Sequence, residues 1–315
     1  MPSGITGVLN LVKPVGMTSH DVVAITRRLT GQRSVGHAGT LDPLASGVLV
    51  VLLGRATSLS SYAMSSAKTY AAEIVFGVAT DTDDAEGRIC AEGSVPSLSR
   101  EEIADRLQDL AGVVMQAPPK FSAIKQGGKT SYVEARRGRA VDLPPRRVEI
   151  TRLGVLSWQP PRLRIVVTCG AGTYIRSLAR DAGELLGSAA YLHTLVRVSS
   201  GGFHIRDAVR VADLTPANIR SHVLPPDAAL ENLRAEFVGP QEAGRIRHGR
   251  TFELPPMLTD GEEVIRVYGD GVLLALARPI VTTGATTPDR PEESDPAQSS
   301  VTTTTWQPFR VMESA

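Results

Sequence analysis

Residues 36–47 read Gly-His-Ala-Gly-Thr-Leu-Asp-Pro-Leu-Ala-Ser-Gly, and the apolar run 48–53 follows them directly. The run is short, rich in β-branched residues and bounded by Gly47 and Gly54, so it predicts a buried strand. The twelve residues before it contain one carboxylate, that of Asp42. Their glycines permit backbone conformations that other residues avoid and allow a ligand to approach closely.

The surrounding sequence predicts a loop that presents the Asp42 carboxylate in a fixed pose. Pro43 biases Asp42 toward an extended conformation. A helix predicted over 19–29, with Ser19 as its N-cap and Gly31 as its stop, leads into the loop. A plain turn, in which the aspartate bonds its own backbone, is the alternative. A phosphate-binding loop is excluded, because no lysine follows the glycines and the loop precedes its strand.

The length and composition are typical of a two-domain protein. The chain has 315 residues, of which 42% are hydrophobic, and a domain usually holds about 150 residues. The sequence contains no run of eighteen apolar residues and no leader peptide, so we expect no membrane span and a cytoplasmic location. Cys90 and Cys169 lack metal-ligand spacing and are expected to be reduced thiols.

The composition changes after the two prolines at 225 and 226. Tyr-Gly-Asp-Gly at 268–271 predicts a hairpin, so residues 231–315 are expected to form a small β domain. Residues 282–305 are rich in Thr, Pro, Ser and acidic residues, which predicts a disordered segment. Residues 306–312 then have the composition of a last strand that rejoins the domain.

The stretch 36–47 closely resembles the catalytic motif of the pseudouridine synthases that modify position 55 of bacterial tRNA. Three further phrases are similar to that family in the same order. These are Lys-x-Tyr with the acidic run that follows it at 68–87, Gly-Thr-Tyr-Ile-Arg at 172–176, and a segment at 195–203 in which Val196 replaces an arginine. The resemblance covers about residues 5–230.

This resemblance implies an α+β fold, with a central mixed, mainly antiparallel sheet flanked by helices in residues 1–230. It implies a PUA-like RNA-binding domain in residues 231–315. Catalytic roles are implied for Asp42, Tyr70 and Arg176, and Lys13-Pro14 resembles a pair that supports the catalytic loop. Substrate contacts are implied for His37, Tyr70, Tyr174, Leu195 and Arg197.

Some of these residues have simpler explanations. Tyr70 fits an edge-of-core tyrosine, and Leu195 fits a core leucine. Arg176 is expected in the first turn of a helix, where the helix dipole disfavours a cation. A carboxylate partner offsets that cost, so we predict a charge-assisted hydrogen bond of about 2.7–2.9 Å between Asp42 and Arg176.

Charged residues cluster in two parts of the sequence, although the net charge of the whole chain is only +1. Residues 120–152 hold nine basic and three acidic residues, whereas residues 68–110 hold four basic and ten acidic ones. A basic patch is what phosphate binding requires, but a solvated surface has the same composition. The basic sequence at about 118–150 resembles the family's RNA-gripping thumb insertion. Its expected RNA contacts are Lys120, Lys125, Arg136 and Arg137.

The resemblance implies isomerisation of uridine to pseudouridine at position 55, in the T loop of tRNA. Uracil would detach from C1′, rotate and reattach through C5. Whether Asp42 attacks C1′ or C6 is left open. The target base must leave its stack, and Tyr70 would supply an aromatic platform for it. An isomerisation needs no redox cofactor, and the sequence shows no metal-ligand cluster.

We expect the T-arm of tRNA as partner, no obligatory protein partner and a monomer. Two other functions stay open. One is a tRNA-binding folding helper that makes no chemical change. The other is the same chemistry on ribosomal RNA within a guide complex.

Overall fold

The computed structural model describes residues 4–121, 143–254, 264–280 and 304–312, and the backbone of two short strands at 125–126 and 129–130. The chain divides into two compact units, Met1–Pro225 and Pro226–Ala315. The boundary expected from the sequence lay slightly later, after residue 230. Each unit has its own sheet and its own hydrophobic core.

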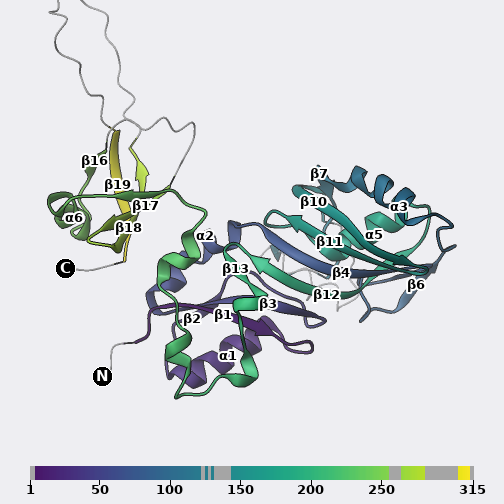
Figure 1. Ribbon diagram of the computed structural model, residues 1–315, viewed down its shortest axis with the longest axis horizontal. Helices are drawn as coiled ribbons and strands as arrows, with labels where there is room; N and C mark the ends of the chain where they lie inside the picture. The colour runs from purple at the N-terminus through teal and green to yellow at the C-terminus, as the bar shows by residue number, and fades with distance from the viewer. Residues whose placement is uncertain are drawn as a thin grey trace, which may run out of the picture. The chain divides into compact units, whose positions relative to one another are not determined.

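The first unit is built around one large sheet (Figure 1). Its strands are β1 (Gly7–Lys13), β2 (Val35–His37), β3 (Ala45–Leu53), β4 (Lys68–Phe76), β7 (Gly112–Gln116), β10 (Arg146–Gln159), β11 (Arg162–Cys169), β12 (Ala190–Ser200), β13 (Phe203–His204) and β14 (Val209–Arg210). They follow the order β14–β1–β3–β12–β4–β11–β10–β7, with β13 beside β12 and β2 beside β3. The pairs β1–β14 and β3–β12 are parallel and the other described pairs are antiparallel, which confirms the predicted mixed, mainly antiparallel sheet.

Two small hairpin sheets accompany the large one. The first pairs β5 (Val78–Thr80) with β6 (Ile89–Glu92), and the second pairs β8 (Lys125–Gln126) with β9 (Lys129–Thr130). The second sheet falls within the expected RNA-gripping insertion. Most of that insertion, including Arg136 and Arg137, lies outside the described residues.

Helices α1 (Ser19–Thr30), α2 (Ser60–Ser65), α3 (Arg100–Leu107) and α5 (Ile175–Leu185) complete this unit. The N-cap of α1 is Thr18 and not Ser19, so the prediction was wrong by one residue. The Thr18 side chain and the Asp21 side chain cap each other's backbone N–H groups, which frees Ser19 for another contact. Gly31 ends the helix in the left-handed conformation, at φ 67°, as predicted.

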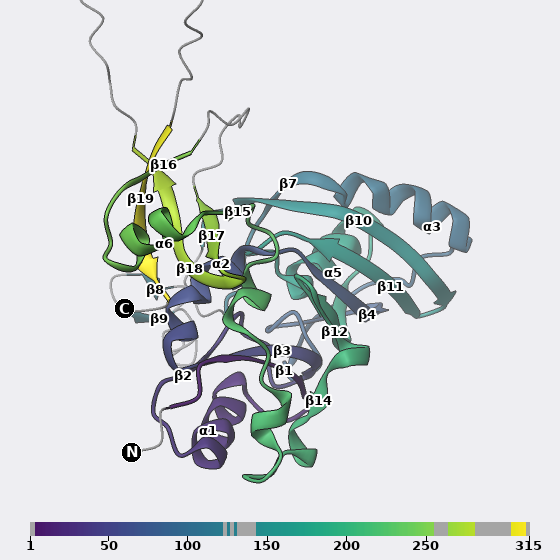
Figure 2. The same ribbon diagram turned by 60° about the vertical axis from the view of Figure 1, so that its left-hand side comes forward.

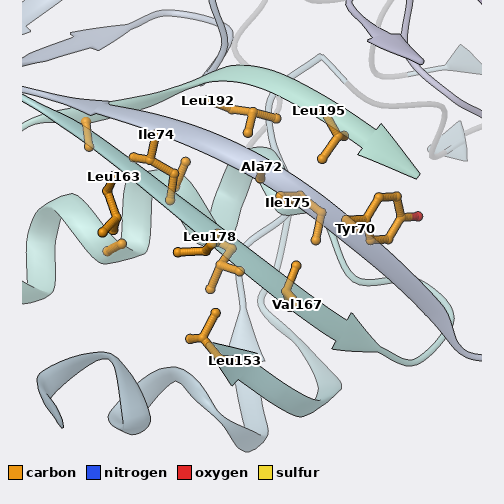
Figure 3. Packing of buried hydrophobic residues seen from close by; sticks show 14 of the residues in the cluster. Tyr70, Ala72, Ile74, Leu153, Leu163, Val167, Ile175, Leu178, Leu192 and Leu195 are labelled. Atoms are coloured by element: carbon orange, nitrogen blue, oxygen red, sulfur yellow. The ribbon is translucent and has the colours of Figure 1, made fainter. Parts of the chain in front are cut away.

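Two hydrophobic cores hold the helices against the sheet. Val22 and Val23 of α1 pack with apolar residues of β1 and β3 (Figure 2). Helix α5 packs over β12 and β4, and helix α3 packs over β10. Tyr70, Ala72 and Ile74 of β4 alternate into the shared core (Figure 3). This alternation brings the Tyr70 end of β4 next to the first turn of α5.

In its described residues the second unit has a five-stranded sheet and the α-helix α6 (Pro240–Arg247), preceded by a 3-10 helix at Pro226–Leu230. Its strands are β15 (Ala235–Phe237), β16 (Phe252–Leu254), β17 (Ile265–Gly269), β18 (Val272–Pro279) and β19 (Thr304–Val311), in the order β15–β17–β18–β19–β16. Asp270 and Gly271 turn the predicted hairpin with φ of 52° and 77°. The predicted last strand is present as β19. It begins at Thr304, so the disorder predicted for 282–305 was wrong at its end, and residues 282–303 lie outside the described chain.

Across the described ranges of both units, no helix combines the length and apolar character that a membrane crossing needs.

Candidate active site

The loop between β2 and β3 carries Asp42 and is attached to neighbouring elements. The Ser19 hydroxyl accepts the N–H of Leu41 at 2.8 Å and donates to its carbonyl at 3.2 Å. The N–H of Gly16 donates to the carbonyl of Pro43 at 2.8 Å. Helix α1 and the turn after β1 therefore fix both sides of the aspartate.

Lys13 fixes that turn from inside. Its side chain is fully buried, and Nζ donates to the carbonyls of Met17 at 2.6 Å and Pro14 at 2.9 Å. Burial lowers the pKa of Lys13 to about 8, while the negative charge of Asp42 acts in the opposite direction. These contacts agree with the supporting role that the family resemblance implies for Lys13-Pro14.

Arg197 lies underneath the same loop. Only 1% of the residue is exposed, and its guanidinium donates to the carbonyls of Val48 at 2.7 Å and Gly39 at 3.1 Å. The backbone passes so closely here that a Cβ on Gly47 would lie 2.3 Å from the Arg197 carbonyl oxygen. These contacts shape the loop, and the substrate contact that the resemblance implies for Arg197 stays a prediction.

Asp42 forms the predicted pair with Arg176. Asp42 Oδ2 lies 2.9 Å from Arg176 Nε; the arginine side chain is 7% exposed and the aspartate side chain 34% exposed. The Nε–H has no aligned hydrogen-bond acceptor among the described residues. The contact is therefore an ion pair at the predicted distance, without the predicted hydrogen-bond direction.

Arg176 is held by further groups that the sequence analysis did not identify. Its Nη1 lies 3.5 Å from Oδ2 of Asp84, a carboxylate with a side chain only 5% exposed, and Nη2 donates to the carbonyl of Phe121 at 3.0 Å. Asp84 is itself fixed, because Oδ1 accepts the Thr82 hydroxyl at 2.6 Å and the Glu86 N–H at 3.1 Å. Two features of the sequence could have indicated a carboxylate here: the Asp-rich run after β4, and the need of a buried arginine for a compensating negative charge.

A cavity of about 960 Å³ opens beside this ion pair. Its walls include Asp42, Tyr70, Tyr174, Arg176 and Leu195, which come from the loop after β2, from β4, from the start of α5 and from β12. Ligand pockets of proteins fall in this range of volume. Five of the residues singled out in the sequence therefore meet at one site.

Tyr70 and Leu195 form an apolar part of this wall. Both lie at the same end of the core cluster (Figure 3), and they are 9% and 7% exposed. Burial raises the pKa of the Tyr70 hydroxyl above its usual value of 10.0, so the phenol is neutral at pH 7. The two side chains offer a flat ring and a branched alkyl group to a planar ligand.

Lys68 also lines the cavity. It belongs to the Lys-x-Tyr phrase, but no separate role was predicted for it. Its Nζ donates to the carbonyls of Met64 and Ser66 at the end of α2. Burial lowers the pKa of Lys68 to about 8. The residue therefore ties α2 to the start of β4, immediately before Tyr70.

His37 and Lys120 are described but are not among the residues that line the cavity. His37 is on β2 with its ring 6.4 Å from that of His20, and the residues that line the cavity do not include it. Burial lowers the pKa of His37, which favours the neutral ring. Lys120 is exposed, and Lys125 is described only through its backbone in β8.

The fold matches that of chains in solved structures. The crystal structure of a Cbf5–Nop10–Gar1 complex contains a chain that is 25% identical, with a TM-score of 0.70, over 88% of this chain and 79% of that one. A structure of an H/ACA RNP bound to a substrate RNA containing 2′-deoxyuridine shares the fold, at 23% identity and a TM-score of 0.68.

Sequence comparisons give the family. Residues 27–175 match the N-terminal domain of the TruB family pseudouridylate synthases. The protein called tRNA pseudouridine synthase B from Symbiobacterium thermophilum is 47% identical over 78% of this chain and 83% of its own length. The Gloeobacter violaceus protein of the same name is 45% identical over 78% and 85%. The fold and the relatives are thus those of a pseudouridine-forming enzyme. The chain belongs to the TruB family.

Proposed function

We propose that this enzyme converts uridine to pseudouridine at position 55, in the T loop of tRNA, and that Asp42 is its catalytic carboxylate. The observation that carries the proposal is the Asp42–Arg176 ion pair, which lies in the wall of a cavity beside Tyr70 and Leu195. Relatives that are 40–47% identical are named tRNA pseudouridine synthase B, which supports tRNA as the substrate.

In the proposed reaction the base leaves its stack, at a cost of a few kcal/mol, and enters the cavity. The ring of Tyr70 and the side chain of Leu195 contact its faces. The bond from C1′ to N1 breaks, the base turns, and a bond from C1′ to C5 forms while the proton on C5 is lost and N1 gains one. Asp42 acts as nucleophile or proton-transfer group, and its 34% exposure leaves it accessible to the nucleotide.

The buried arginine gives this carboxylate a fixed direction. Arg176 lies between Asp42 and Asp84, so its single charge is attracted by both carboxylates. Because the arginine side chain is only 7% exposed, solvent screens this attraction weakly.

The rest of the chain supplies RNA contacts in this proposal. The basic insertion, with Lys120, Lys125, Arg136 and Arg137, binds phosphates of the T-arm, and His37 stacks within the T loop in the space that the flipped base leaves. The second unit is proposed as a PUA-like accessory RNA-binding domain. Its helix α6 ends in basic residues, and Arg245 and Arg250 are exposed there. A monomer without an obligatory protein partner is sufficient for this function.

The alternative of a tRNA-binding folding helper is less well supported. A protein that only binds RNA gains nothing from a partly exposed carboxylate in its pocket, since the ligand is an anion. The further alternative, action on ribosomal RNA within a guide complex, would require other partners. Both alternatives are distinguished by the same experiment.

The test is to incubate the purified full-length protein with an unmodified tRNA transcript and to map pseudouridine along it. We expect modification at position 55 and loss of the signal in a transcript with cytidine at that position. Binding of tRNA without any pseudouridine would favour the folding helper. Modification of a ribosomal RNA fragment only after a guide RNA and its partner proteins are added, without modification of tRNA by the protein alone, would favour the guide-dependent reaction.

A further inference from the structure

We propose that Gln116 and Arg146 are positioning residues that together hold Tyr174 in the wall of the active-site cavity. The inference rests on the proposed function for its kinetic consequences. Its structural part can be tested without activity.

Gln116 fixes the backbone of Tyr174. The residue is 2% exposed; its Oε1 accepts the N–H of Tyr174 at 2.8 Å and its Nε2 donates to the Tyr174 carbonyl at 3.1 Å. Tyr174 is the N-cap of α5, and its own side chain makes no capping bond. One buried amide therefore accepts the Tyr174 N–H and adds a second donor to the Tyr174 carbonyl, which also accepts the Leu178 N–H at 3.1 Å in the first turn of α5. Loss of the amide would leave the Tyr174 N–H without this partner.

Arg146 fixes the other side of the same loop. Its Nη2 donates to the carbonyl of Gly172, and its guanidinium carbon lies 4.9 Å from the centre of the Tyr174 ring. Gly172 has a φ of 88°, a conformation that favours glycine. Arg146 thus lies against the aromatic face while it also holds the turn that leads to the ring.

The sheet brings these two side chains together. Gln116 is the last residue of β7 and Arg146 is the first of β10, and the two are direct register partners in the antiparallel pair. Directly opposed residues project on the same face of a sheet. The paired strand ends therefore act as one clamp on residues 172–174, and both Arg146 and Tyr174 line the cavity.

A phosphate-binding role is the obvious alternative for an arginine at this place. The geometry favours positioning, because the guanidinium already contacts a carbonyl and an aromatic ring. Its Nε is buried and has no hydrogen-bond partner among the described residues, so the two roles need a direct test. The two roles differ in one measurable respect. A lost phosphate contact lowers the slope of log K against log salt by about 0.7–0.9, whereas a lost clamp leaves that slope unchanged.

The kinetic test is a double-mutant cycle in the full-length enzyme with a tRNA transcript. We expect Arg146→Gln to lower kcat by about 3- to 30-fold, the range of one desolvated cation–aromatic contact, with KM within about twofold. The loss should disappear in the Tyr174→Leu background and persist in the Tyr174→Phe background, which keeps the ring. An equal loss of kcat on Arg146→Gln in the unsubstituted, Tyr174→Leu and Tyr174→Phe enzymes would contradict the proposed positioning role. A reduced slope of log K against log salt would contradict it as well. Arg106→Gln, an exposed arginine of α3, is the control for loss of one positive charge.

The structural test is amide hydrogen exchange of the free protein at Tyr174. We expect Gln116→Ala and Arg146→Gln each to accelerate this exchange at least about tenfold, while Arg106→Gln does not. Unchanged exchange in both clamp variants would reject the proposal even if the enzyme is active. Accelerated exchange in a protein that forms no pseudouridine would retain the clamp and reject the proposed function.

Discussion

Oδ2 of Asp42 lies 2.9 Å from Nε of Arg176, so a salt bridge joins the loop before β3 to the first turn of α5. The helix dipole opposes a cation at that turn, and Asp42 and Asp84 offset this effect from two directions. The pair therefore explains both why a buried arginine is tolerated and why the aspartate has a fixed direction. The predictions below start from this pair and move outward.

Asp42→Asn should abolish turnover, by about 10³-fold or more, while tRNA binding stays largely intact. The substitution keeps the shape of the side chain and removes its charge and nucleophilicity. Pseudouridine formation and tRNA affinity should be measured on the same preparations. Asp105→Asn, which neutralises an exposed carboxylate of α3, is the matched control. Turnover within a few fold of the unmodified enzyme would remove Asp42 from the catalytic role.

Arg176→Lys should lower kcat by roughly 10- to 100-fold, the effect of losing one hydrogen bond to a charged group. Lysine keeps the charge but lacks the planar fork that reaches Asp42, Asp84 and the Phe121 carbonyl together. Circular dichroism and the melting temperature should show a folded protein. Full activity would mean that charge alone is sufficient at this position.

Charge reversal of Arg136 and Arg137 to Glu should weaken tRNA binding and flatten its dependence on salt. Each lost phosphate contact lowers the slope of log K against log salt by about 0.7–0.9. Binding titrations at several salt concentrations measure this slope directly. An unchanged slope would indicate that these two arginines do not contact the RNA backbone.

Lys13 should make the free energy of unfolding depend on pH above neutrality. Its pKa is about 8 in the folded protein against 10.5 in the unfolded chain, so between these values the unfolded state binds more protons and stability rises with pH. The free energy of unfolding of the unsubstituted protein, relative to that of Lys13→Met, should rise by up to about 3 kcal/mol between the two pKa values. Denaturant unfolding at pH 7.5, 9 and 10.5 (roughly the span of that window) tests this. A constant difference between the two proteins would show that the lysine titrates normally.

Charge reversal of Arg245 and Arg250 to Glu should reduce tRNA affinity and leave kcat at saturating tRNA unchanged. Both side chains are exposed near the end of α6, and phosphate contacts there would add affinity without touching the reacting base. Arg310→Glu makes the same type of charge change on β19 of this unit. An equal loss of affinity in that control would mean that the unit attracts RNA only through its overall charge.

The sequence by itself determined the elements whose causes lie within a few residues. The apolar run between two glycines is β3, Gly31 ends α1, and Asp270-Gly271 turns a hairpin. The resemblance to the family motifs also identified five candidate site residues that line one cavity, namely Asp42, Tyr70, Tyr174, Arg176 and Leu195. Local conformation and a familiar pattern of residues were sufficient for this much, because neither depends on how distant segments pair.

Tertiary structure decided the contacts that join segments far apart in the chain. Ser19 was expected to cap a helix and instead holds Leu41, and Arg197, which lines the cavity, also binds the Val48 carbonyl beneath the loop. Gln116 carries no local signal of its role, and the Asp-rich run around Asp84 does not by itself show which carboxylate meets Arg176. Their partners are set by the register of β4, β7, β10 and β12 and by the packing of α5 on that sheet. Register follows from burial of a whole face at once, and the sequence around any single residue does not contain that information.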